Sequence, residues 1–300
     1  MMLNRRLVLT VALCLAPTAS GAVALAQSSG APPAADRAAQ TAAPKRPLDV
    51  PFVPTRQEVV DQMLKMADVD KNDHVIDLGS GDGRIVISAA KLGARGVGVD
   101  INPVRIAESR ENARTAGVDE RVRFIEGNLF TADLSGATAV TLYLLPEVNL
   151  KLRPKLLREL RPGTPIVSHD FDMGEWQPDR TVNMGTATVY QWIVPAQVAG
   201  GWTARIGEGA QAREIGINLQ QEFQVVGGSA RMNGKRMPLS DVTLRGDALS
   251  FTVAGMPEGR LIFRGKANGD KIEGTVAPEA KPGQTQPFTA QKGTASTARR

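Results

Sequence analysis

The chain contains little cysteine and little histidine, and this scarcity excludes most disulfide and metal chemistry. Cys14 is its one cysteine, and His74 and His169 are its two histidines. One cysteine cannot close an internal disulfide, and two isolated histidines are too few for a zinc site. We therefore expect no bound metal. The net charge of +5 over 300 residues argues neither for nor against a nucleic-acid partner.

The first 26 residues follow the pattern of an export signal. Arg5 and Arg6 form a short basic start, residues 7–26 are apolar, and small residues surround the point where a signal peptidase would cut. We expect cleavage after Ala26, a periplasmic location and no membrane span in the mature chain. An uncleaved membrane anchor is the alternative, which Pro17 disfavours because it would interrupt a spanning helix. The paired arginines also resemble a twin-arginine export signal.

Composition and periodicity divide the rest of the chain into four parts. Residues 27–50 are rich in alanine, proline, serine and glutamine and are expected to form a disordered linker. Residues 51–195 alternate between strand and helix patterns. Residues 200–278 carry short alternating segments separated by turn signals, which predicts a small antiparallel β-domain. Residues 279–300 are polar and are expected to form a flexible tail.

Within residues 51–195 the alternation predicts a doubly wound, Rossmann-like α/β sheet. A first helix is expected to begin with a capping box at Thr55 and Glu58. The expected strands are 75–78, 96–101, 122–125, 139–145 and 165–169, followed by a closing antiparallel pair at 181–184 and 186–194. The expected helices between them are 84–92, 102–116 and 154–160. The sheet would therefore have seven strands.

A glycine-rich turn follows the first expected strand. Gly79, Gly81 and Gly83 come after Asp77, with Ser80 between the first two glycines. Glycine lets the backbone turn sharply and approach a ligand closely, and this position is the crevice where open α/β sheets bind ligands. A dinucleotide-binding sequence would place its third glycine one residue later. A carboxylate at Asp77 would repel a pyrophosphate, whereas it would attract the α-amino group of a methionine moiety.

Polar residues also follow the second and third expected strands. Asp100 ends the second strand, where a carboxylate accepts hydrogen bonds from ribose hydroxyls. Asn128 follows the third strand, where its side chain would bond the amino group of adenine, and Ile101 and Leu129 would flank the adenine ring. Each residue alone could belong to an ordinary turn or loop. Together, in this order on successive strand ends, they predict a binding site for S-adenosyl-L-methionine.

These motifs resemble those of a known family. Residues 51–194 are similar to the archaeal broad-specificity protein-lysine methyltransferases and to the mitochondrial ATP synthase c-subunit lysine methyltransferase. The matching stretches are residues 51–55, 77–84, 141–149 and 167–171, and residues 146–149 followed by 156–162 also resemble the seven-strand histone lysine methyltransferases. The resemblance implies a class I methyltransferase fold, S-adenosyl-L-methionine as cofactor and a protein lysine as methyl acceptor.

The end of the fourth expected strand bears on the acceptor. Enzymes that methylate the amino groups of bases usually end this strand with an Asp/Asn-Pro-Pro-aromatic motif, whereas this chain has Tyr143 followed by Leu-Leu-Pro-Glu. A nucleic-acid acceptor is therefore not expected.

Methyl transfer to lysine requires a neutral amine, and a lysine with a pKa near ~10.4 is charged at neutral pH. Apolar walls beside a cationic sulfonium would lower that pKa. Tyr143, Phe171 and Trp176 are candidates for these walls, with Tyr143 the catalytic candidate, although each could instead be a core aromatic. Glu147 is a candidate general base. Two alternative functions remain. The first is a small-molecule methyltransferase. The second is an exported binding protein that keeps the fold without the reaction, because the cofactor is made in the cytosol and an exported enzyme would lack a supply of it.

Overall fold

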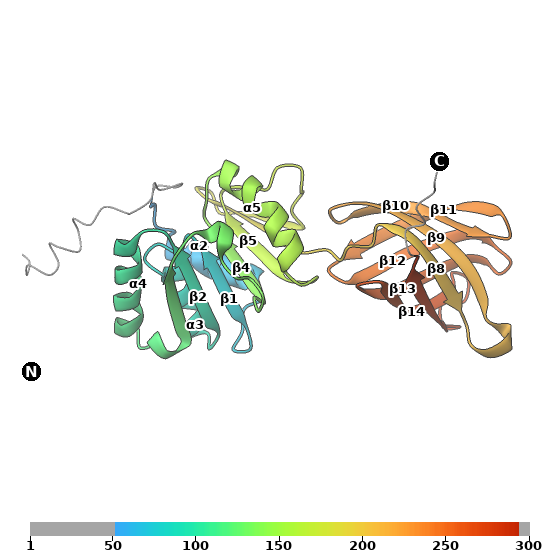
Figure 1. The fold of residues 1–300 in the computed structure, drawn as a ribbon, viewed down its shortest axis with the longest axis horizontal. Helices are drawn as coiled ribbons and strands as arrows, with labels where there is room; N and C mark the ends of the chain where they lie inside the picture. Colours follow the sequence, from blue (N-terminus) through green and yellow to red (C-terminus); the bar gives the residue numbers. More distant parts are fainter. Residues whose placement is uncertain (1–51, 294–300) are drawn as a thin grey trace, which may run out of the picture.

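The computed structural model describes residues 52–293, which form two domains joined by a short segment (Figure 1). The export signal predicted at 1–26 and the linker predicted at 27–50 lie outside the described residues. Among the helices of the described range, none has the length and apolar character needed to cross a membrane.

The first domain is a seven-stranded sheet with helices packed on both faces. Its helices are α2 (Gln57–Met66), α3 (Arg84–Lys91), α4 (Pro103–Thr115) and α5 (Pro146–Glu159). Its strands are β1 (His74–Leu78), β2 (Arg95–Asp100), β3 (Val122–Glu126), β4 (Ala139–Leu142), β5 (Pro165–His169), β6 (Arg180–Asn183) and β7 (Thr188–Ile193). The order across the sheet is β3-β2-β1-β4-β5-β7-β6, and β7 runs antiparallel to β5 and to β6. The expected α/β sheet with its closing antiparallel pair is confirmed.

Two apolar cores explain why the central strands carry apolar residues on both faces. On one face, α2 and α3 pack against β1 and β4 through side chains such as Val59 and Ile85. On the other face, α5 packs through Leu152 and Leu156. Because alternate residues of each strand point into alternate cores, a strand covered on both faces reads as a nearly continuous apolar run.

The strand order creates a crevice beside β1. Strand β1 pairs in parallel with β2 on one side and with β4 on the other. The chain therefore leaves β1 toward one edge of the sheet and leaves β4 toward the other. The loops after these two strands diverge, and open α/β sheets bind ligands in the gap between such loops.

Three local predictions in this domain are wrong. Helix α5 begins at Pro146 rather than at residue 154, because Leu145 is extended and proline is favourable at the first helical position. The fourth strand consequently ends at Leu142 rather than at residue 145. The capping box does not form, because the N-cap of α2 is Arg56, whose side chain makes no capping hydrogen bond.

The second domain is a closed antiparallel barrel. Its strands are β8 (Gly200–Ile206), β9 (Arg213–Glu222), β10 (Val225–Met232), β11 (Lys235–Arg245), β12 (Ala248–Met256), β13 (Gly259–Asn268), β14 (Lys271–Pro278) and β15 (Gln286–Lys292). Each strand pairs with the next along the chain, and β15 pairs back with β8. Buried side chains that include Trp202, Phe251, Phe263 and Phe288 fill the interior. The expected antiparallel β-domain is confirmed.

The flexible tail predicted from residue 279 is wrong where β15 forms. Phe288 and Ala290 are buried, whereas Thr289 and Gln291 between and after them are exposed. This alternation places one face of β15 in the barrel core, and its backbone pairs with both β14 and β8. The polar composition that suggested a tail belongs to the outer face of the closing strand.

The β9–β10 turn of the barrel packs on the first domain. The ring of Phe223 stacks on Trp176 with 5.9 Å between ring centroids, and the guanidinium of Arg153 lies 5.1 Å from the Phe223 centroid. Beside it, Gln224 Nε2 donates a hydrogen bond to the backbone oxygen of Gln177 at 2.7 Å. The barrel therefore contributes one aromatic side chain to the core on the α5 face.

Candidate active site

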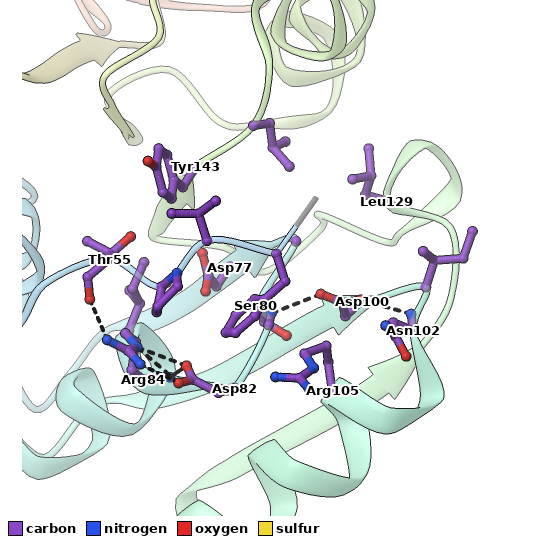
Figure 2. Close-up of a pocket in the computed structure, with 18 of the residues that line it drawn as sticks. Thr55, Asp77, Ser80, Asp82, Arg84, Asp100, Asn102, Arg105, Leu129 and Tyr143 are labelled. Atoms are coloured by element: carbon purple, nitrogen blue, oxygen red, sulfur yellow. Dashed lines mark hydrogen bonds and ion pairs between the residues drawn. The ribbon is translucent and has the colours of Figure 1, made fainter. Parts of the chain in front are cut away.

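A cavity lies at the carboxyl ends of β1, β2, β3 and β4, where the crevice is expected (Figure 2). The predicted cofactor-binding residues other than Gly83, together with the catalytic candidate Tyr143, line it: Asp77, Gly79, Ser80, Gly81, Asp100, Ile101, Asn128, Leu129 and Tyr143. In Figure 2, Tyr143 and Leu129 lie above the acidic and polar side chains that follow β1 and β2. The structure thus brings together residues from four separate strand ends.

The glycine turn needs glycine for conformation and for space. Gly79, Gly81 and Gly83 all have positive φ, at 85°, 53° and 81°. A Cβ at Gly79 would stand 2.7 Å from the Leu144 side chain, and one at Gly83 would stand 2.6 Å from the ring of Phe124. Gly83 is the N-cap of α3 and packs under the turn, so its role is to shape the loop rather than to face the cavity.

Asp77 is a buried carboxyl at the end of β1. It is 2% exposed, and Thr141 Oγ1 donates a hydrogen bond to its Oδ1 at 2.7 Å. Burial raises its pKa from 3.8 to about 7, and the neighbouring Asp100 and Asp82 add to this rise, while the Thr141 hydrogen bond opposes it. A cation in the cavity would favour the ionised carboxylate, so this wall is suited to a positively charged ligand group.

Asp100 is held by the backbone around it. Gly81 N donates to its Oδ2 at 2.9 Å, and Asn102 N donates to its Oδ1 at 2.8 Å. Each carboxylate oxygen keeps a lone pair for a further donor such as a ribose hydroxyl. Ser80 Oγ is also buried, and it has no hydrogen-bond partner within the described part of the chain. The cavity therefore offers both fixed and unpaired polar groups to a ligand.

Asn128 caps a short turn, which is the ordinary role that a turn residue at this position could have. Its Oδ1 accepts a hydrogen bond from Phe130 N at 2.9 Å and so caps the short 3₁₀ turn Leu129–Thr131. One lone pair of this oxygen remains for an amino group. Ile101 and Leu129 are each half-buried at the cavity wall, where they present apolar surface.

The segment before α2 closes one side of the cavity, and its residues were not predicted as site residues. Arg84 pairs with Asp82 through two nitrogens, and its Nη1 donates to the backbone oxygen of Thr55 at 2.6 Å. The ring of Phe52 lies so close to Gly81 that a Cβ there would stand 2.4 Å from it. The guanidinium of Arg105 covers the same ring at 4.5 Å. Only the resemblance of residues 51–55 to the family motif signalled this segment.

Aromatic rings form the wall opposite the glycine turn. Tyr143 and Phe171 both line the cavity, with ring centroids 6.1 Å apart and planes 18° from parallel. Burial, and to a smaller extent the Asp170 carboxylate, raise the pKa of Tyr143 above 10.0, so its phenol is neutral at physiological pH. An amine entering between these rings would leave water for a largely apolar surface, which favours its neutral form.

Two other candidates lie elsewhere. Trp176 does not line the cavity, because it is fully buried between Trp192 and Phe223. The prediction that Trp176 forms a wall of the acceptor channel is wrong, and Trp176 is instead a core aromatic residue. Glu147 lies exposed in the first turn of α5 and does not line the cavity, so the structure places it away from the position of a general base.

The cavity fits S-adenosyl-L-methionine, since it joins a cation-favouring carboxyl, a fixed carboxylate, an unpaired buried hydroxyl and apolar walls. This site at the switch point of a 3-2-1-4-5-7-6 sheet defines a class I methyltransferase that uses S-adenosyl-L-methionine. The family model described as the ANTKMT methyltransferase domain matches residues 77–180. A protein-lysine N-methyltransferase of Saccharolobus islandicus is 45% identical over 151 residues, which cover 48% of this chain and 94% of that protein. The chain belongs to the protein-lysine N-methyltransferase family.

Two further proteins are also similar to this chain. The ATP synthase C-subunit lysine N-methyltransferase of Mus musculus is 30% identical over 197 residues, which cover 66% of this chain and 76% of that protein. A crystal structure described as an RNA methyltransferase from Salinibacter ruber, in complex with S-adenosyl-L-homocysteine, is 60% identical with a TM-score of 0.48. It covers 49% of this chain and 96% of that chain.

Proposed function

We propose that this protein transfers a methyl group from S-adenosyl-L-methionine to the side-chain amine of a lysine in another protein. The observation that carries the proposal is the wall of Tyr143 and Phe171, which faces the cofactor cavity with aromatic ring surface. Membership of the protein-lysine N-methyltransferase family supports the same acceptor.

Methyl transfer from a sulfonium requires little covalent catalysis by the protein. Bound S-adenosyl-L-methionine supplies an electrophilic methyl group with a good leaving group. The protein has to align the acceptor nitrogen and to hold it without its extra proton, and alignment alone can supply much of the acceleration. We propose that Asp77, Asp100, Ser80 and the glycine turn hold the cofactor, and that Tyr143 touches the acceptor amine.

We further propose that the protein works outside the inner membrane. This proposal rests on the basic and apolar pattern of residues 1–26. Its acceptors would then be proteins of the periplasm or the outer surface of the inner membrane.

Transfer of tritiated methyl from S-adenosyl-L-methionine into periplasmic extract would test the proposed acceptor. We expect label in protein, recovered as methyl-lysine after hydrolysis. Asp100→Ala is the matched control, and it should lose both cofactor binding by calorimetry and labelling. Label recovered in RNA or in small molecules would overturn the lysine assignment, and cofactor binding with no transfer to any fraction would favour a non-catalytic binding protein.

A further inference from the structure

A buried histidine connects the cavity to solvent at the end of β5. Thr55 lines the cavity and is 4% exposed. Its Oγ1 lies 3.2 Å from Nδ1 of His169, whose side chain is 7% exposed and does not line the cavity. On the far side of the ring, Nε2 lies 3.3 Å from Oδ2 of Asp170, which is 32% exposed. Three polar groups thus form a continuous line from the cavity to water.

The backbone fixes the orientation of the outer carboxylate. Asp170 has φ of 59°, an uncommon value for a residue other than glycine. Its Oδ1 accepts a hydrogen bond from Thr188 N at 2.8 Å, and its own N donates to Thr188 O at 2.7 Å. With Oδ1 held by the neighbouring strand, Oδ2 is left to face the histidine ring.

This arrangement selects one tautomer of His169. The negative charge of the Asp170 carboxylate, with Oδ2 3.3 Å from Nε2, favours the tautomer that carries its proton on that nitrogen. In the neutral ring Nδ1 is then an acceptor, and Thr55 must donate its hydroxyl hydrogen to it. The lone pairs of the Thr55 oxygen consequently remain free to accept a hydrogen bond from a donor in the cavity.

Burial keeps the ring neutral, and the charged and titratable groups around it act in opposite directions. Asp170 is adjacent in the chain, Arg56 approaches from the start of α2, and Tyr143 packs against the ring at a tilt of 33° with 3.9 Å between centroids. Burial is the largest influence and lowers the pKa of His169 below its ordinary 6.5, while Asp170 opposes this and Arg56 adds to it. At neutral pH the ring is therefore an available base.

We propose that Thr55, His169 and Asp170 form a proton relay that removes a proton from the acceptor ammonium. This inference rests on the proposed lysine acceptor. The ammonium gives a proton to Thr55 Oγ1 as the Thr55 hydroxyl gives its own proton to His169 Nδ1. The resulting imidazolium loses a proton to water on the side of Asp170. One proton has then moved from the ammonium to solvent, the amine keeps its lone pair, and exchange with water restores the starting tautomer between turnovers.

The geometry can be tested by NMR without cofactor or acceptor. The chain has two histidines, so His74→Gln assigns the remaining ring signals to His169. Long-range proton–nitrogen spectra are expected to show the proton on Nε2, with a pKa below 6.5. Asp170→Asn should lower that pKa further, because it removes the carboxylate that raises it. A proton on Nδ1 in the wild-type protein would overturn the relay.

The relay also makes a kinetic prediction that a merely structural role does not. With tritiated S-adenosyl-L-methionine and periplasmic extract, Thr55→Val should lower the rate at pH 7 by about 100-fold, a typical contribution of positioned proton transfer. The deficit should shrink as pH rises toward the acceptor pKa, since the amine then loses its proton unaided. Thr55→Ser keeps the hydroxyl and should recover the rate at least about tenfold relative to Thr55→Val.

The outcomes separate the relay from the proposed function. An equal deficit for Thr55→Val at every pH, or loss of cofactor binding in that variant, would overturn the relay while leaving lysine methylation in place. Absence of labelled lysine with the wild-type protein would instead overturn the proposed function. His74→Gln is the control variant in this assay, because His74 lies at the start of β1, at the opposite end of that strand from the cavity.

Discussion

Replacing Asp77 by Asn is expected to make the protein more stable and less able to bind its cofactor. Asp77 is a fully buried carboxyl whose pKa rises from 3.8 to about 7 in the folded protein, chiefly through burial. A raised pKa means that the folded state binds more protons than the unfolded state between these values. Stability from this group is thus present below pH 4 and is lost as pH rises to about 7.

The size of this effect follows from the two pKa values. A carboxyl whose pKa moves from 3.8 to about 7 costs on the order of 4 kcal/mol of folding free energy above pH 7. Asparagine retains an oxygen that can accept the Thr141 hydrogen bond and carries no charge. Asp77→Asn should therefore exceed the wild type in stability at pH 8, and its advantage should be smaller at pH 5 by about 2 to 3 kcal/mol.

Urea unfolding at both pH values measures the advantage. Trp176 and Trp192 are buried in the first domain and report its unfolding by fluorescence. Glu147→Gln, which removes an exposed carboxyl on α5, is the control and should follow the wild type. A stability advantage of Asp77→Asn that is the same at pH 5 and pH 8, or a loss of stability at pH 8, would show that burial does not raise the pKa of Asp77 in this way. Cofactor affinity should fall by at least about tenfold, because a cation loses its buried partner.

Three further substitutions test the packing around the site. Gly98→Ala places a Cβ 2.6 Å from Ser80 Oγ, so it should displace the glycine turn and weaken cofactor binding by about tenfold or more in calorimetry. Phe223→Ala removes the stack on Trp176 and should destabilise the first domain by about 2 kcal/mol in urea unfolding, whereas Phe223→Tyr should not. Asn149→Ala removes the amide that donates to two backbone carbonyls after β5, and it should raise KM for the acceptor while cofactor affinity stays unchanged.

The strand ends and helix starts that depend on a few neighbouring residues could be predicted from the sequence. Asp77 and Asp100 could be placed near strand ends because each follows the apolar residues of an expected strand, close to the glycine turn or the helix start that comes next. The helix expected at 102–116 forms as α4, and Asn102 Oδ1 caps its start by accepting a hydrogen bond from Val104 N. These signals lie within a few residues of the structure that they specify.

The contacts that sequence reasoning missed join residues that are far apart in the chain. Thr55 has the spacing of a helix cap, yet its hydroxyl meets His169, which is 114 residues away. Phe52 reads as an apolar residue of an extended segment, and its place over Gly81 depends on how that segment crosses the strand ends. Trp176 cannot be assigned to the cavity or the core until its neighbours are known, and one of them, Phe223, comes from the other domain.

The buried carboxyl of Asp77 bears on the proposed export of the chain. S-adenosyl-L-methionine is charged and does not cross an apolar bilayer unaided. Without a cationic ligand, the buried Asp77 carboxyl destabilises the folded domain at neutral pH. With ligand at 100 times its Kd, binding adds about 2.7 kcal/mol of stability. A chain that folds in the cytosol therefore gains stability by binding its cofactor as it folds. A chain that folds after export has no cytosolic cofactor to bind and does not gain this stability.

The ligand content of protein isolated from the periplasm distinguishes export of the folded chain from export of the unfolded chain. Export of the folded chain predicts close to one bound S-adenosyl-L-methionine or S-adenosyl-L-homocysteine per protein, released on denaturation and identified by mass spectrometry. Replacing Arg5 and Arg6 by lysine should then abolish export, because the folded route is the one that reads paired arginines. Protein that arrives without nucleoside, and that still arrives after this replacement, would mean that the chain crosses unfolded and meets its cofactor by another supply.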